Sequence, residues 1–174
     1  MKLDEDSRDR FLVITPYTKR LGIAVFRGAE LVYFGVKTFQ RPRTCESIRK
    51  ETAEKLTEMI GEFRPRLVIL KSLTSHQAVS DKHRRVAATI SHIANIVGIG
   101  SEERSFEDAV KKIVADNEPL KIRAFEILCQ LYPELARFIQ FQNRSQEEYY
   151  TPMLAAITIG VAYGHNFNMQ SQHG

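Results

Sequence analysis

Residues 11–37, FLVITPYTKRLGIAVFRGAELVYFGVK, contain the pattern that decides the fold. A continuous apolar run, Phe11–Ile14, stops at Thr15-Pro16, a second run follows over Leu21–Phe26, and a third, charged at both ends, covers Glu30–Lys37. Turn-forming residues separate the three runs, with Pro16 in the first connection and Gly28 in the second. Runs of this length, joined by tight turns, predict three strands in an antiparallel meander.

The residues after this meander predict helices and strands in alternation. Thr44 or Ser47 caps a long helix that Pro65 ends, and Arg66–Lys71 reads as a strand buried on both faces. The other predicted elements are a helix over 77–97, a weak extended segment near 103–106, helices over 107–114 and 120–131, a short helical piece from 133, and a last helix over 152–163 with Pro152 in its first turn. The predicted class is α/β, with a mixed five-stranded sheet and helices on both faces.

Length and composition favour one ordinary globular domain. The chain has 174 residues and 20.0 kDa, of which 43% are hydrophobic and 26% charged. We expect a single domain over 10–165, a flexible leader over 1–9 and a flexible polar tail over 166–174. Two cysteines make no disulfide framework, no apolar run is long enough for a membrane span, and the acidic start lacks a secretory pattern. These features predict a cytoplasmic protein without a membrane partner.

The net charge of +4 is unevenly distributed along the chain. Residues 10–50 hold nine Lys and Arg against two Asp and Glu, and residues 63–100 hold six against one. Beyond Tyr150 there is no charged residue of these four types. If the two basic stretches share a face, they form a patch suited to polyanions; the alternative is that surface charges segregate by chance.

Several stretches resemble the RuvC-type Holliday-junction resolvases, which have a ribonuclease H-like fold. Residues 14–25, ITPYTKRLGIAV, are similar to the family's opening strand and turn, and residues 67–71, LVILK, occupy the place of its fourth strand. The stretches Ala109–Val114, Lys121–Leu131 and Met153–Ile159 resemble three later helices. The resemblance implies a ribonuclease H-like fold and, in the family, acidic residues that hold two divalent metal ions for nuclease chemistry.

The residues at the family's acidic positions are not acidic here. The resemblance places Thr15 and Lys71 at the two strand positions, and it places the final-helix positions near Tyr149 and Pro152. Only Glu147 and Glu148 are close enough to contribute, because 10–29, 63–80 and 149–174 contain no Asp or Glu. We therefore predict an inactive member with no metal and no cofactor. In the alternative alignment, Lys71 is a solvated strand end.

The same resemblance suggests which residues contact nucleic acid. Tyr17 occupies the position of a family glycine, where it either stacks on a base or blocks the emptied metal site. The candidate phosphate-binding residues are Lys19, Arg20, Arg41, Arg43, Lys71, Lys82, Arg84 and Arg85. The alternative for Lys82–Arg85 is an ordinary solvated helix face.

Three functions remain open from the sequence. The first is a non-cleaving module that binds branched or duplex DNA or RNA. The second is a regulatory module whose partners are proteins only, and the third is a divergent metal-dependent endonuclease that uses Glu147 or Glu148. The family resemblance also suggests a homodimer.

Overall fold

The computed structural model describes residues 10–40, 44–73, 80–114 and 121–171, with side chains up to Gly164. Its sheet has five strands in the order β3-β2-β1-β4-β5. The strands are β1 (Arg10–Pro16), β2 (Arg20–Arg27), β3 (Glu30–Thr38), β4 (Leu67–Lys71) and β5 (Gly100–Arg104). The first three are antiparallel neighbours, and β4 and β5 run parallel to β1. The predicted meander and mixed sheet are confirmed.

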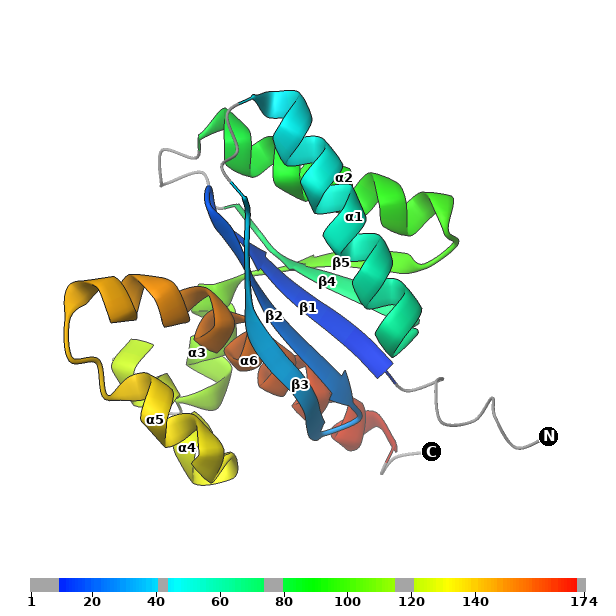
Figure 1. Cartoon of the computed structure of the whole chain (residues 1–174). Helices are drawn as coiled ribbons and strands as arrows, with labels where there is room; N and C mark the ends of the chain where they lie inside the picture. The colour runs from blue at the N-terminus through cyan, green and yellow to red at the C-terminus, as the bar shows by residue number, and fades with distance from the viewer. Residues whose placement is uncertain (1–9, 41–43, 74–79, 115–120, 172–174) are drawn as a thin grey trace.

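Helices cover both faces of this sheet (Figure 1). On one face lie α1 (Cys45–Phe63) and α2 (Asp81–Ile96), and on the other lie α3 (Phe106–Ile113) and the long α6 (Arg144–Ser171). Between α3 and α6 the chain forms α4 (Lys121–Leu131), the 3-10 turn η1 (Pro133–Leu135) and α5 (Ala136–Ile139). Within the described residues, no helix carries a hydrophobic stretch that could cross a lipid bilayer.

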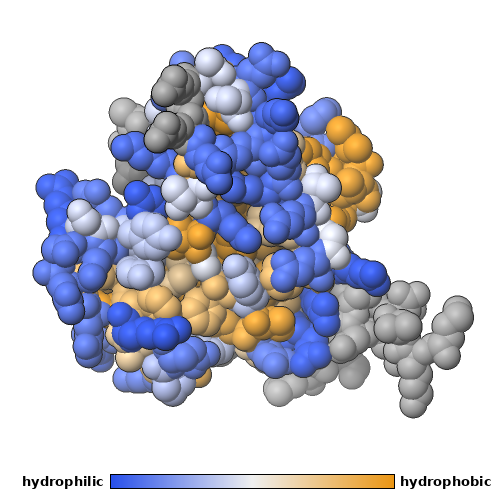
Figure 2. Space-filling view, viewed as in Figure 1, coloured by the Kyte–Doolittle hydropathy of each residue, from blue (hydrophilic) through white to orange (hydrophobic). Residues whose placement is uncertain are grey.

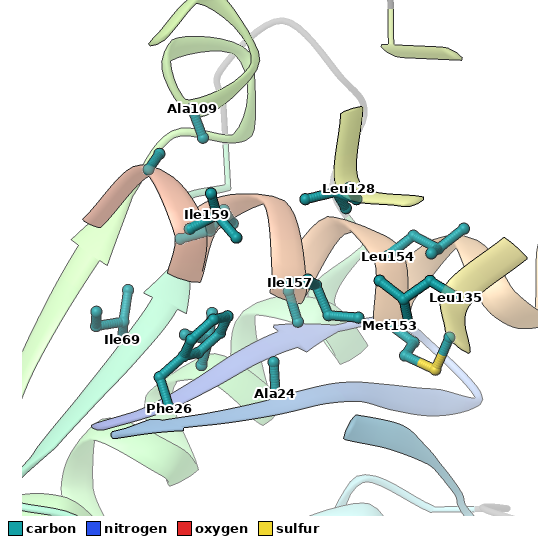
Figure 3. Packing of buried hydrophobic residues seen from close by; sticks show 14 of the residues in the cluster. Ala24, Phe26, Ile69, Ala109, Leu128, Leu135, Met153, Leu154, Ile157 and Ile159 are labelled. Carbon is teal, nitrogen blue, oxygen red and sulfur yellow. The ribbon is translucent and has the colours of Figure 1, made fainter. Parts of the chain in front are cut away.

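The strand sequence divides its side chains between two cores. Leu12 and Ile14 of β1 pack with α1 and α2, whereas Phe11 and Val13 pack toward α6, because successive side chains on a strand point to opposite faces. Figure 3 shows the second core, where side chains of α6 such as Ile157 lie over Ala24 and Phe26 of the sheet. Both faces of β1 are therefore buried, as a continuous apolar strand requires.

Two helix boundaries differ from the prediction. The second helix begins at Asp81, because the side chain of Ser80 accepts a hydrogen bond from the backbone N–H of His83 (3.4 Å) and caps the helix. The last helix begins at Arg144 and not at Pro152, since Asn143 Oδ1 accepts from the Gln146 N–H (3.0 Å). Pro152 lies inside α6.

The end of the last helix also differs from the prediction. Its backbone continues past the predicted end at Tyr163 to Ser171. The flexibility expected for 166–174 stays a prediction, and the leader over 1–9 lies outside the described residues.

Candidate nucleic-acid interface

The end of β1 is packed directly beneath α6. Thr15 is fully buried, and its hydroxyl donates a hydrogen bond to the backbone carbonyl of Pro152. Gly22, the partner of Thr15 on β2, leaves room for this approach, because a β-carbon there would overlap the Pro152 carbonyl and the Thr15 hydroxyl. The structure thus brings Thr15 and Pro152 together, and a neutral hydrogen bond joins them.

Lys71, at the end of β4, lies among aromatic rings. Its ammonium is 5.3 Å from the ring centroid of Tyr17 and 5.4 Å from that of Phe106. The ring of His83 meets the Tyr17 ring edge-on, with centroids 5.9 Å apart. We call Lys71, Tyr17, Phe106 and His83 the Lys71 cluster. Cation–π attraction stabilises an ammonium in such surroundings, so Lys71 is a half-buried, packed residue and not a freely solvated strand end.

The Lys71 cluster also changes the titration of its histidine. Burial lowers the pKa of His83 below the ordinary value of 6.5, and the nearby positive charge of Lys71 lowers it further. Its Nδ1 is 3.2 Å from the Ser80 hydroxyl, in a hydrogen bond whose donor depends on the tautomer. His83 is therefore mostly neutral at pH 7.

Beside this cluster, a pocket of about 520 Å³ opens between the β1–β2 turn and the first turns of α6. We call it the hairpin pocket. Its lining residues are Tyr17, Thr18, Lys19, Arg20, Lys121, Arg144, Glu147, Glu148 and Thr151. Tyr17 belongs both to this pocket and to the Lys71 cluster, so the two regions adjoin.

Both carboxylates of the hairpin pocket are paired with cations. Glu147 is 3.8 Å from Lys121, and Glu148 accepts a hydrogen bond from Arg144 at 2.9 Å. Arg20 lies with its guanidinium carbon 5.0 Å from the ring centroid of Tyr149, which is itself exposed. The four cations exceed the two carboxylates, so the pocket has a net positive charge.

These residues do not suit a divalent metal ion. Mg²⁺ prefers several oxygen ligands with negative charge, but the ends of β1 and β4 present a hydrogen-bonded hydroxyl and an ammonium. Among the described side chains, no three His, Cys, Asp or Glu residues lie close enough together to hold a metal ion.

The other predicted contact residues lie on α2. Lys82, Arg84 and Arg85 are all exposed in its first two turns, on either side of His83. Because His83 contacts Tyr17, this basic run begins next to the Lys71 cluster. Arg41 and Arg43 lie outside the described residues. Figure 2 shows mainly hydrophilic surface over α1 and at the left, where α6 begins, and more hydrophobic surface lower down around β3 and α6.

Sequence reasoning did not find several residues of this region. Phe106, Lys121, Arg144 and Thr151 come from α3, α4 and α6, far along the chain from the β1–β2 turn. One local signal was available, since Asn143 followed by Gln146 is a helix-start pattern. It would have moved the start of α6 and brought Arg144 and Glu148 onto one helical face.

The comparisons with known proteins identify the fold. No protein-family model matches the sequence, and no curated protein sequence matches it. The structure is similar to that of RuvC from Thermus thermophilus, with a TM-score of 0.71 and 14% identity over 92% of this chain and 96% of that chain. It is also similar to T. thermophilus RuvC in complex with Holliday junction substrate, with a TM-score of 0.68, 13% identity and coverage of 92% and 95%.

A third similar structure is the yeast mitochondrial Holliday junction resolvase, with a TM-score of 0.62, 9% identity and coverage of 97% and 85%. At these identities the likeness concerns the fold. The predicted resemblance is thus confirmed at that level: the chain has the ribonuclease H-like fold of the RuvC-type resolvases.

Proposed function

We propose that this chain binds branched or duplex nucleic acid through the end of the sheet where β1 and β4 finish, and does not cleave it. The observation that carries the proposal is that this end of the sheet has neutral and positive side chains at positions where the resemblance implies negative ones. Where the resemblance implies metal-binding carboxylates, the chain has buried Thr15 and the Lys71 cluster, and basic side chains lie beside them.

The arrangement of cations supports phosphate contacts. Lys19 and Arg20 lie at the β1–β2 turn, and Lys82, Arg84 and Arg85 lie in the first two turns of α2. Both segments adjoin Tyr17, whose ring contacts Lys71 and His83. Contacts of this kind release counterions from the nucleic-acid backbone, so they supply affinity with little sequence preference. A RuvC structure of the same fold was solved with Holliday junction substrate, which makes a four-way junction the first ligand to try.

The experiment titrates the purified protein against a labelled four-way DNA junction and a length-matched duplex, at about 50 and 200 mM salt. We expect binding that weakens by orders of magnitude over this range and is independent of sequence. Arg84→Ala and Arg85→Ala should each weaken binding and lower the salt slope by about 1.

The matched control is Arg64→Ala. Arg64 is an exposed cation that ends α1 at the opposite end of the sheet, where the next residues enter β4. The control should leave junction affinity unchanged. Equal effects of Arg84→Ala and Arg64→Ala, or no binding at low salt, would contradict the proposal. In the latter case, a protein-only partner becomes the better hypothesis.

The same mixtures, incubated with Mg²⁺, test the absence of cleavage. We expect intact DNA after long incubation with every variant. Cleavage that survives repurification and disappears in Glu147→Gln or Glu148→Gln would establish the divergent endonuclease instead.

A further inference from the structure

The hairpin pocket has two cations that no carboxylate neutralises. Within the part of the chain that the structure describes, Glu147 and Glu148 are paired with Lys121 and Arg144, whereas Lys19 and Arg20 have no carboxylate partner. A net charge of two remains, in a pocket whose volume of about 520 Å³ falls within the range of small-molecule sites. The pocket therefore suits a compact ligand with two negative charges.

Arg20 is held in place without using its hydrogen-bond donors. Its guanidinium lies over the ring of Tyr149, and no described acceptor is paired with its side-chain N–H groups. An arginine positioned in this way retains donors that fit two oxygens of one phosphate group. Lys19, which is exposed at the pocket, adds a second cation.

The hydroxyl group of Thr151 lacks the hydrogen bond that two other buried helical threonines make. The buried helical threonines Thr52 and Thr158 donate to the carbonyl four residues earlier, each at 2.7 Å. The Thr151 hydroxyl is also buried, but it has no partner. Threonine has two accessible χ1 states in a helix, and an unpartnered buried hydroxyl is costly. Rotation toward an anion in the pocket would satisfy it.

We propose that the hairpin pocket binds the phosphate monoester of a nucleotide, held by Lys19, Arg20 and Thr151. A monoester carries up to two negative charges at pH 7, which matches the two unneutralised cations, whereas an internal phosphodiester carries one. For the end of a nucleic-acid strand as the ligand, the proposal rests on the proposed function. The monoester belongs either to a strand end or to a free nucleotide.

The test uses four probes with the full-length protein. Three are one short oligodeoxynucleotide carrying a 5′-phosphate, a 3′-phosphate or no terminal phosphate, and the fourth is adenosine 5′-monophosphate. We expect a terminal phosphate at one end to tighten binding about tenfold. Tight binding of the mononucleotide alone would identify a free nucleotide as the ligand. Equal affinity for all three oligonucleotides, together with no binding of the mononucleotide, would overturn the proposal.

Variants that are expected to change phosphate binding in opposite directions test whether the phosphate binds in this pocket. Lys19→Gln and Arg20→Gln should abolish most of the gain from the phosphate, whereas Glu148→Gln should increase it by releasing Arg144. Thr151→Val should reduce the gain several-fold while the melting temperature stays unchanged or rises, because an unpartnered hydroxyl is removed. The charge control Arg64→Gln should change nothing. If the phosphate gain survives Lys19→Gln and Arg20→Gln, the phosphate binds elsewhere and the assignment is wrong.

This experiment is separable from that on the junction. If junction binding responds to Arg84→Ala but the terminal phosphate adds nothing, only the pocket assignment fails. If the phosphate gain is present and lost in the pocket variants while junctions and duplexes do not bind, the proposed function fails and the monoester site stands.

Discussion

Gly22 is the residue at which the sheet and α6 come closest. A β-carbon at this position would meet backbone atoms of Pro152, which cannot move without shifting the helix. We expect Gly22→Ala to lower the free energy of unfolding by about 3 kcal/mol, at the upper end of typical overpacking costs, as measured by urea denaturation.

Gly61 is the matched control for this substitution. It is an exposed glycine of α1 with no atom near the position of a β-carbon. Gly61→Ala should raise the free energy of unfolding by about 0.5–1 kcal/mol, because it relieves the entropic cost of a helical glycine. A Gly22→Ala protein as stable as the wild type would contradict the close packing of Gly22 against Pro152.

His83 reports on the charge of Lys71. Burial lowers its pKa first and Lys71 second, so we expect Lys71→Met to raise the pKa of His83 while leaving it below 6.5. The control Lys82→Met removes an exposed neighbouring charge and should have little effect. A histidine NMR titration measures both. An unchanged pKa in Lys71→Met would show that the ammonium does not lie in the cluster.

The lowered pKa of His83 also determines how the stability of the protein changes with pH. Because the folded-state pKa is below the unfolded value, neutral His83 contributes stability that is fully present above pH 6.5. That contribution is lost as the pH falls through the lower folded-state pKa. Lys71→Met should therefore reduce the loss of stability on acidification.

At the scale of elements, β1 and α6 are joined where the resemblance would place metal ligands. Restoring an acid by Thr15→Asp should not rebuild a metal site, since the new carboxylate would be buried against the Pro152 carbonyl. We expect it to destabilise the protein by at least about 3 kcal/mol at pH 7.

The neutral control for this change is Thr15→Asn, whose amide can donate to the same carbonyl. Burial raises the pKa of a carboxyl group, so the Asp variant should approach the Asn variant in stability as the pH falls toward about 4. Denaturant unfolding at several pH values measures the difference. Equal stability of the two variants at pH 7 would mean that the site accepts a negative charge.

At the scale of the whole molecule, the side chains at the end of the sheet where β1 and β4 finish predict that divalent metal ions do not change the stability of the fold. A metal ion present at a concentration of 100 times its dissociation constant would stabilise the fold by about 2.7 kcal/mol. Since the described residues offer no cluster of metal-binding side chains, we expect the melting temperature to be the same in millimolar Mg²⁺ and in EDTA. A clear rise in Mg²⁺ would indicate a rearranged metal site.

Most of the architecture was predictable because it depends on local pattern. Continuous apolar runs between turns are enough for β1 and β2, and Thr44 with Ser47 forms the predicted cap of α1. The predicted helix boundaries were wrong where a less obvious capping residue, and not the most obvious sequence signal, sets the end of the helix. Pro152 suggested a helix start, but Asn143 caps the helix earlier.

The candidate interface was predictable only in part. Lys19, Arg20 and Lys71 came from the resemblance; Lys19 and Arg20 line the hairpin pocket, and Lys71 lies against Tyr17, which lines the same pocket. Phe106 and Thr151 carried no sequence signal, because an aromatic or a threonine on a helix is ordinary until a partner from another element lies against it.

The amino-acid sequence by itself determined the strand and helix order, the burial of β4 on both faces, and the absence of acids near Thr15 and Lys71, since each follows from residue type and spacing. Only the tertiary structure decided that Tyr17 and Phe106 surround Lys71 and that Lys121 is paired with Glu147 of the hairpin pocket. Those contacts join residues distant in the chain, and packing of α3, α4 and α6 on the sheet sets their distances.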